Sequence, residues 1–273
     1  MMKMMCDREC KIVFCDVDGT LLSSKLEVLP GTLKAIHSLQ KRGIPFIIAS
    51  SRGPMAIRPI FSEWGFSCPT ICYGGALLLD TQGGRIASSA LAHNDAARVL
   101  AFVEGESLEC TWNIYAGDMW LVKDRIDPRV VLEEHIVRAA STQGSLASIG
   151  KGEVHKILLM CEPSAILDIE CKLKDAFPAL SVVKSSSYLL EVMQGGVTKA
   201  GALCHFCALY GVSTDETAAF GDNYNDEQML KVVGLPFLMG NAPEELKSRF
   251  KNVAPDNDSE GIYLSLKKLR LVD

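Results

Sequence analysis

An apolar strand, a helix and a second apolar strand follow one another early in this chain, at the spacing of a β–α–β unit. Residues 11–15 are largely apolar and run directly into Asp16, which is typical of a buried strand that ends in a polar loop. Apolar residues recur on one side of residues 31–42, and Gly43 follows them as at the end of a helix. Residues 44–49 form a second apolar run. Because strands joined by a helix lie parallel, the segment predicts an α/β fold with helices on the faces of a parallel sheet.

The alternation of strands and helices stops after Gly83-Gly84 and returns at about residue 196. Between these points we expect helices over 93–104, 128–139 and 163–176, a hairpin over 108–123, and strands over 154–161, 180–184 and 187–193. Strands of this kind pair mainly antiparallel and form, with the helices, a self-contained α+β domain. The chain is therefore predicted to have one α/β domain over residues 1–83 and 194–273, split by an inserted α+β domain over 84–193.

The composition is that of a folded protein with a large core. Of the 273 residues, 48% are hydrophobic and 22% are charged, which excludes a disordered chain and a coiled coil. Lys and Arg total 28 against 33 Asp and Glu, a net charge of −5, which disfavours a dedicated nucleic-acid or anionic-membrane partner. The chain has no membrane-length apolar run and no signal-peptide pattern at its start, so we expect a cytoplasmic protein whose ten cysteines do not imply disulfides.

Four polar clusters follow apolar strands or open a helix: residues 16–20, Ser50, Lys199 and residues 221–226. Ligands of parallel sheets bind beyond the carboxyl ends of the strands, so clusters far apart in the sequence can converge there. Aspartates from two segments make an oxygen-rich site that suits Mg²⁺, which also binds substrate phosphate. A hydroxyl and a lysine suit a phosphoryl dianion, and a carboxylate can act as its nucleophile. The clusters therefore predict Mg²⁺-assisted phosphoryl chemistry.

These clusters carry a resemblance to a known family. Residues 16–22 (DVDGTLL) resemble the signature of the haloacid dehalogenase-like phosphatases, and residues 49–52, 196–203 and 221–226 resemble its other three motifs in order and spacing. The long insertion resembles the Cof-type subgroup with its subclass IIB cap, and residues 239–242 (MGNA) resemble the family's loop after the fourth motif. The resemblance implies a Rossmann-like parallel-sheet core domain with an inserted α+β cap domain that sets substrate specificity.

The resemblance also implies a role for each motif residue. Asp16 is the nucleophile that becomes an aspartyl-phosphate, and Asp18 protonates the leaving oxygen and later takes a proton from water. The implied metal ligands are Asp16, the main-chain carbonyl of Asp18, and Asp222. The implied substrate-binding residues are Ser50, Lys199, Gly19, Asn225 and Asn241. Further residues near the site are Asp226, which supports the metal or the phosphate, and Ser51 and Arg52.

Three segments depart from the usual family pattern. The third motif has Lys199-Ala200-Gly201 where Lys-Gly is frequent, which leaves Lys199 in place. Ser50-Ser51-Arg52 stands where Thr-Gly-Arg is frequent, which keeps the hydroxyl, and Gly74-Gly75-Ala76 stands where Asn-Gly-Ala is frequent. The predicted function is a Mg²⁺-dependent phosphatase acting on a small phosphorylated metabolite, with sugar phosphates first among them. Two alternatives stay open: a phosphomannomutase-like phosphotransferase, which would interconvert isomers without releasing phosphate, and a non-catalytic binding module that keeps the fold.

Overall fold

The computed structural model describes residues 10–273, which divide into two compact units. The first unit contains the described chain up to Ser50, together with Phe61–Arg85 and Thr198–Asp273. The second unit contains Ser51–Ile60 and Ile86–Val197. The main crossings between the units thus fall after Arg85 and after Val197, and the short segment 51–60 joins the second unit, a division that the predicted boundaries did not include.

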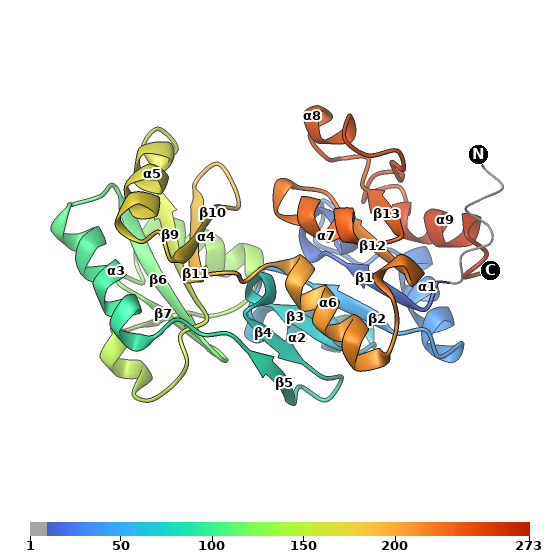
Figure 1. Cartoon of the computed structure of the whole chain (residues 1–273), viewed down its shortest axis with the longest axis horizontal. Coiled ribbons are helices and arrows are strands. Elements are labelled where there is room, and N and C mark those ends of the chain that lie inside the picture. The colour runs from blue at the N-terminus through green and yellow to red at the C-terminus, as the bar shows by residue number, and fades with distance from the viewer. Residues whose placement is uncertain (1–9) are drawn as a thin grey trace. The chain divides into compact units, whose positions relative to one another are not determined.

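The first unit is built on a sheet of seven strands among the described residues, in the order β13-β12-β1-β2-β3-β4-β5 (Figure 1). The strands are β1 (Ile12–Cys15), β2 (Phe46–Ala49), β3 (Thr70–Cys72), β4 (Leu77–Leu79), β5 (Arg85–Ser88), β12 (Thr217–Gly221) and β13 (Leu235–Leu238). Strands β13, β12, β1, β2 and β3 run parallel, and β4 is antiparallel to β3. Strands β1, β2, β3 and β12 are buried throughout, as expected of parallel strands with helices on both faces.

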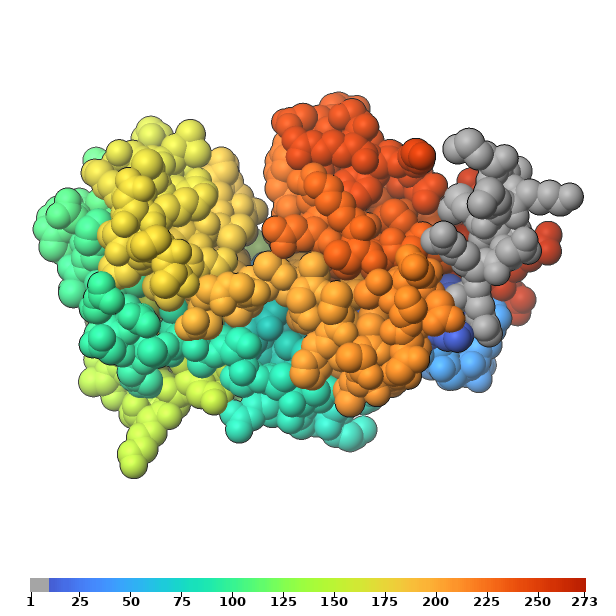
Figure 2. All heavy atoms as spheres, in the orientation of Figure 1, coloured from blue at the N-terminus to red at the C-terminus, as the bar shows by residue number. Residues whose placement is uncertain are grey.

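The helices that accompany this sheet are α1 (Pro30–Lys41), α2 (Pro54–Trp64), α6 (Lys199–Tyr210), α7 (Glu227–Val232), α8 (Glu244–Lys247) and α9 (Gly261–Lys268). Helices α1, α2 and α7 connect neighbouring parallel strands, α6 precedes β12, and α8 and α9 follow β13. The first residues of α2, up to Ile60, are grouped with the second unit. Helix α1 packs against α9, and α6 packs against α7. Part of α6 is visible in orange in Figure 2. Its residues Leu209 and Tyr210 are exposed. The predicted strand–helix–strand unit is confirmed by β1, α1 and β2. Helix α2 was not predicted, because Pro54 and Pro59 obscure its pattern, although proline is tolerated in a first helical turn.

The second unit contains a sheet of six strands among the described residues, in the order β10-β11-β9-β6-β7-β8. The strands are β6 (Cys110–Ala116), β7 (Met119–Val122), β8 (Thr142–Gln143), β9 (Lys156–Cys161), β10 (Leu180–Lys184) and β11 (Leu189–Gln194). Neighbouring strands are antiparallel except for β7 and β8. Helices α3 (His93–Gly105), α4 (Pro128–Val137) and α5 (Ile166–Ala176) complete the unit. The predicted α+β character and the hairpin over 108–123 are confirmed.

The two faces of this second sheet differ in chemistry. Side chains such as Ile114, Ile157 and Val192 belong to one apolar core that also includes residues of α3 and α5. Because side chains alternate along a strand, the residues between them point to the other face. That face carries a buried ion pair between Lys156 Nζ and Glu191 Oε1, at 3.1 Å. The described helices contain no segment that is long and apolar enough to cross a membrane.

Candidate active site

The polar loop after β1 forms the first part of the site. Asp16 is the residue after the strand, and its backbone N–H still donates to Phe220 O of the neighbouring β12, at 3.0 Å. The chain then turns tightly over Val17–Leu21, where Leu21 N donates to Asp16 O at 3.2 Å. Gly19 has a φ of +76°, a backbone conformation that other residues rarely adopt. The turn therefore stops the strand abruptly and leaves the Asp16 carboxylate at its carboxyl end.

The loop after β12 supplies the second part. Asp222 follows β12 directly, and Asp226 ends the short helical turn Tyr224–Asp226. The Asp226 Oδ2 atom accepts hydrogen bonds from the backbone N–H groups of Asp222, at 3.0 Å, and Asn223, at 3.2 Å. Because β1 and β12 are parallel neighbours, their carboxyl ends lie at the same edge of the sheet. Residues 16–20 and 221–226, the first and fourth polar clusters, therefore lie at one edge of the sheet, as predicted.

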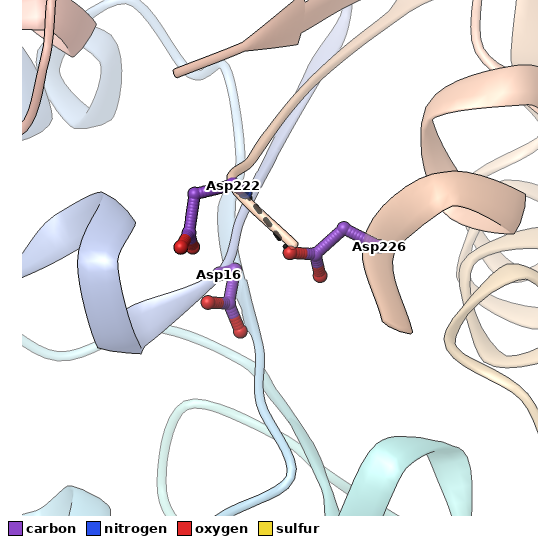
Figure 3. Close-up of side chains that lie close together, drawn as sticks. All are labelled: Asp16, Asp222 and Asp226. Carbon is purple, nitrogen blue, oxygen red and sulfur yellow. Dashed lines mark hydrogen bonds between the residues drawn. The ribbon is translucent and has the colours of Figure 1, made fainter. Parts of the chain in front are cut away.

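The carboxylates of Asp16, Asp222 and Asp226 point toward one another (Figure 3). One oxygen of each lies within 4.8 Å of the others, so this group could hold a metal ion. Asp16 and Asp226 are buried, and Asp222 is partly exposed. Carboxylate oxygens are ligands for hard cations such as Mg²⁺ and Ca²⁺, and the donor set fits such an ion. Asp18 is exposed, and its carboxylate is outside this group; its implied main-chain contribution remains a prediction.

Lys199 connects two of the three carboxylates. It is the first residue of α6, a helix whose N-cap Thr198 accepts a hydrogen bond from Gly201 N at 3.0 Å. Its Nζ atom lies 2.6 Å from Asp16 Oδ1 and 2.7 Å from Asp226 Oδ1. One ammonium against three ionised carboxylates leaves two negative charges, which is the charge that a divalent cation would balance.

The crowding of these charges shifts their pKa values. Burial, followed by the neighbouring Asp226 carboxylate, raises the pKa of Asp16 well above its ordinary value. The same two causes raise the pKa of Asp222 to about 7, against the opposing effects of Thr20 and Lys199. Burial alone would lower the pKa of Lys199, but Asp16 and Asp226 raise it above its usual value, so the lysine stays charged. Asp16 and Asp222 therefore bind protons more strongly than free carboxylates when no cation is present.

Two glycines leave room for carboxylates of the site: Gly19 for Asp222 of the other loop, and Gly221 for Asp226 of its own loop. A Cβ atom on Gly19 would lie 2.4 Å from Asp222 Oδ2, and one on Gly221 would lie 2.5 Å from Asp226 Cβ. Both distances are too short for a real contact. A side chain also holds the turn after β1 in place: Asn241 Nδ2 donates a hydrogen bond to Gly19 O at 2.8 Å. Its implied contact with substrate remains a prediction.

Ser50 lies at the end of β2, the other neighbour of β1. It is fully buried, its N–H donates to Ile71 O at 2.9 Å, and its carbonyl accepts from Gly74 N at 2.9 Å. This places Ser50 at the same sheet edge as Asp16. The roles assigned to Ser50 and to the partly exposed Asn225 remain predictions.

Ser51 and Arg52 belong to the second unit. The carbonyl of Ser51 accepts a hydrogen bond from Lys156 Nζ at 2.7 Å, and Arg52 is buried. Any part that they take in binding stays a prediction.

Sequence reasoning missed one residue and underestimated another. Thr20 lies inside the first motif without an assigned role, yet its hydroxyl donates to Asp222 Oδ1 at 2.9 Å. Asp226 was assigned only a supporting role, although it is the most buried of the three acids and contacts Lys199. The spacing of Asn223 and Asp226, which forms a reciprocal capping box, was the available signal for a fixed carboxylate at that position.

Comparison with known proteins agrees with the geometry. The family model of the haloacid dehalogenase-like hydrolases matches residues 13–266, and the chain belongs to this family. A relative from Haemophilus influenzae, whose name assigns it provisionally to the phosphatases, is 33% identical over 258 residues, covering 94% of this chain and 97% of its own. The pyridoxal phosphate phosphatase of Escherichia coli is 24% identical, over 92% of this chain and 96% of its own.

A solved structure with the same fold is described as a subclass IIB sugar phosphatase of the HAD superfamily. It superposes with a TM-score of 0.83 at 22% identity, covering 96% of this chain and all of the other. The predicted family and the predicted α/β fold with a parallel-sheet core are confirmed by these matches. The predicted enzyme class, a phosphatase within this hydrolase family, is confirmed as well.

Proposed function

We propose that this enzyme is a Mg²⁺-dependent phosphatase that cleaves a small phosphorylated metabolite, such as a sugar phosphate, through an aspartyl-phosphate on Asp16. The observation that supports it most is the convergence of Asp16, Asp222 and Asp226 around the ammonium of Lys199. A buried carboxylate at the end of a strand is a nucleophile with little freedom to move, which favours attack from one direction.

In this proposal named side chains carry out each step. An Asp16 oxygen attacks phosphorus, the bond from phosphorus to the ester oxygen breaks, and the leaving oxygen takes a proton from Asp18. Water then attacks the phosphorus of the aspartyl-phosphate, and Asp18 takes a proton from that water. The bond from phosphorus to the Asp16 oxygen breaks, so the Asp16 carboxylate is restored and inorganic phosphate leaves. Lys199 and the Ser50 hydroxyl hold phosphoryl oxygens, and Lys199 also favours the ionised form of Asp16 that the attack needs.

The three carboxylates would hold Mg²⁺, which supplies the positive charge that lets a phosphate dianion approach a carboxylate. The pKa of about 7 for Asp222 means that protons compete with the cation at this position near neutral pH. Asp226 is held by two backbone N–H groups, so its orientation does not depend on the ion.

We assign the choice of substrate to the inserted domain predicted over residues 84–193. The similar proteins include one named as a sugar phosphatase and one named as a pyridoxal phosphate phosphatase, so esters of both kinds belong in the first test. A cytoplasmic location, and the absence of a nucleic-acid or membrane partner, are parts of the same proposal.

The test is a phosphate-release assay with the purified chain. Hexose, pentose and nucleotide phosphates, pyridoxal phosphate and p-nitrophenyl phosphate are each incubated with Mg²⁺, and in parallel with EDTA. We expect Mg²⁺-dependent release of inorganic phosphate from at least one metabolite, EDTA to stop it, and added Mg²⁺ to restore it. Interconversion of sugar phosphate isomers without phosphate release would replace the phosphatase with a phosphotransferase. Absence of turnover on every ester would overturn both.

A further inference from the structure

Two cysteines of the second unit face each other across neighbouring strands. Cys110 of β6 and Cys161 of β9 are direct partners in the antiparallel register. Their backbone N–H groups point elsewhere, that of Cys110 to Leu108 O at 2.7 Å and that of Cys161 to Tyr188 O at 2.7 Å. The neighbouring rung is hydrogen-bonded, since Glu162 N donates to Glu109 O at 3.0 Å. Cys110 and Cys161 are thus a non-hydrogen-bonded pair of the antiparallel ladder. The Cα atoms of such pairs typically lie about 4.5 Å apart, within the range that a disulfide spans.

The two thiols have different surroundings. Cys161 is 1% exposed and belongs to the apolar core between the sheet and its helices, whereas Cys110 is at the margin of that core and is partly accessible. The cationic side chains of Arg129 and Lys123 act on Cys110. Arg129 is held in place by Asp127, whose Oδ2 atom lies 2.7 Å from Arg129 Nη2.

This asymmetry assigns different chemistry to the two sulfurs. The neighbouring Cys161 thiol, with Arg129 and Lys123, lowers the pKa of Cys110 against the effect of burial. Cys110 and burial raise the pKa of Cys161, whose thiol donates to Leu159 O at 3.8 Å. The thiolate is the reactive form of cysteine, so the more accessible thiol is also the better nucleophile.

Other cysteines of the chain provide the contrast. Burial raises the pKa of Cys10 to about 11, that of Cys68 to about 12 and that of Cys207 to about 11. Such thiols are protonated at neutral pH and behave as small apolar side chains. Accessible position, nearby cations and a cysteine directly opposite come together at Cys110.

We propose that Cys110 and Cys161 form a peroxide-reactive dithiol that closes into a reversible disulfide within the second unit. The Cys110 thiolate attacks one oxygen of hydrogen peroxide, an S–O bond forms, the O–O bond breaks, and the departing hydroxide takes a proton to become water. Cys161 then loses its proton and attacks the Cys110 sulfur, an S–S bond forms, the S–O bond breaks, and a second water leaves. Both thiols are oxidised by two electrons in total, and the peroxide is reduced to two waters.

The product is a covalent link between β6 and β9, which are adjacent in the middle of the six-stranded order. A small thiol, such as dithiothreitol, reverses it by thiol–disulfide exchange. The inference is independent of the proposed phosphatase activity, because neither sulfur belongs to the carboxylate site and the readout below measures no turnover.

The experiment treats the reduced full chain with hydrogen peroxide at neutral pH, alkylates the remaining thiols with N-ethylmaleimide in denaturant, and maps the peptides by mass spectrometry. We expect a cross-linked pair of peptides that contains Cys110 and Cys161, lighter than the two thiol peptides by two hydrogen atoms and lost after dithiothreitol. It should form before oxidation is detected at Cys68 or Cys207. Full alkylation of both Cys110 and Cys161 after peroxide would overturn the proposal. Oxidation of Cys110 to the sulfinic acid with Cys161 still alkylated would overturn it as well.

Variants separate the two roles. In Cys161→Ala the first step should still occur, so dimedone should label the Cys110 sulfenic acid. In Cys171→Ala, a matched change at an exposed cysteine of α5, the cross-link should form as in the unmodified chain. Dimedone labelling of Cys161 in a Cys110→Ala variant, at the rate seen for Cys110, would overturn the assignment of Cys110 as the attacking thiol. The cross-link in the unmodified chain needs no variant to fold, so the main result stands without them.

Discussion

The two sheets of this protein place their polar side chains by different rules. In the mainly parallel sheet of the first unit, strands such as β1 and β12 are buried throughout, and the acids begin one residue beyond the strand. In the antiparallel sheet of the second unit, polar and apolar residues alternate within one strand, as Asn113, Ile114 and Tyr115 do in β6. Polar side chains thus gather at one edge of the first sheet, whereas in the second sheet they are distributed over one face.

The difference decides what each unit can do with charge. At the edge of the first sheet, three carboxylates from two loops face one another with a single ammonium between them. On the second sheet the buried charges of Lys156 and Glu191 are paired one to one. The first arrangement keeps an excess of negative charge, which favours cation binding at a cost in stability. In the second arrangement the two charges balance each other.

Replacement of the predicted nucleophile should have the greatest consequence. Asp16→Asn should lower turnover of any phosphate ester by about 10⁴-fold or more, because an amide cannot form the acyl-phosphate. The same change removes one acid from a crowded site, so the melting temperature should be unchanged or higher. Steady-state assays and calorimetry on the same preparations measure both.

The matched control is Asp215→Asn, which makes the same charge change at an exposed position of the first unit. It should leave turnover within about twofold of the unmodified enzyme, as surface substitutions usually do. Residual activity of Asp16→Asn at the level of this control would exclude Asp16 as the nucleophile.

The excess of negative charge should also be visible as a pH dependence of stability. Because the pKa of Asp222 is raised to about 7, its stabilising contribution is full at low pH, where the carboxyl is protonated, and is lost as the pH rises through about 7. In EDTA, the unmodified chain should therefore lose roughly 5–10 °C of melting temperature relative to Asp222→Asn between pH 5 and pH 8. Mg²⁺ at pH 8 should restore the unmodified chain and not the variant.

Scanning calorimetry at both pH values, with and without Mg²⁺, makes the comparison. Asp222→Asn keeps an oxygen that can accept the hydrogen bond from Thr20, so the variant isolates the charge. A difference in melting temperature that stays constant from pH 5 to pH 8 would show that Asp222 is already ionised in the folded protein at the lower pH.

The same contrast explains how far sequence alone could go. The acids of the first unit were predictable because a buried strand has a visible end: the apolar run of β1 stops at Asp16 and that of β12 stops at Gly221-Asp222. The contacts of Lys199 with Asp16 and Asp226 were not predictable, because they depend on side-chain directions across residues far apart in the chain. The motif resemblance supplied the identity of Lys199, and the structure supplied its partners.

The second unit was harder to interpret for a physical reason. Its α+β character and its hairpin followed from turn signals at Gly117-Asp118, but pairing across a sheet depends on register, and a shift by one residue moves every side chain to the opposite face. Cys110 and Cys161 are 51 positions apart, so no local pattern indicates that they are partners. Helix α2 was missed because Pro54 and Pro59 weaken its pattern.

The close approach of the loops after β1 and β12 can be tested by replacing a glycine with alanine. Gly19→Ala would place a Cβ atom 2.4 Å from Asp222 Oδ2, and it would do so at a φ of +76°. The displaced carboxylate should lower turnover by about 10- to 100-fold, since a shift of about 1 Å at a catalytic group can cost that much. Titration of the activity with Mg²⁺ should show a weaker apparent affinity for the cation.

Gly83→Ala is the matched control for backbone strain. Gly83 has a φ of +80°, and a Cβ atom there would meet nothing within 4 Å. Both variants should lose about 1–2 kcal/mol of stability from the left-handed backbone, but only Gly19→Ala should lose turnover. Equal turnover in the two variants would contradict the view that the turn after β1 positions the metal site through Gly19.

In the second unit a neutral neighbour, rather than an excess of charge, changes the reactivity of a side chain. The Cys161 thiol lowers the pKa of Cys110, so Cys161→Ala should raise that pKa and reduce the thiolate present at neutral pH. Alkylation of Cys110 by iodoacetamide at pH 7, followed by peptide mass spectrometry, should slow by about threefold to tenfold, while Cys171→Ala leaves the rate unchanged. The difference should vanish at high pH, where Cys110 is ionised in both proteins. A slower rate that persists at high pH would instead indicate reduced access to Cys110, and a change in its pKa would not be the cause.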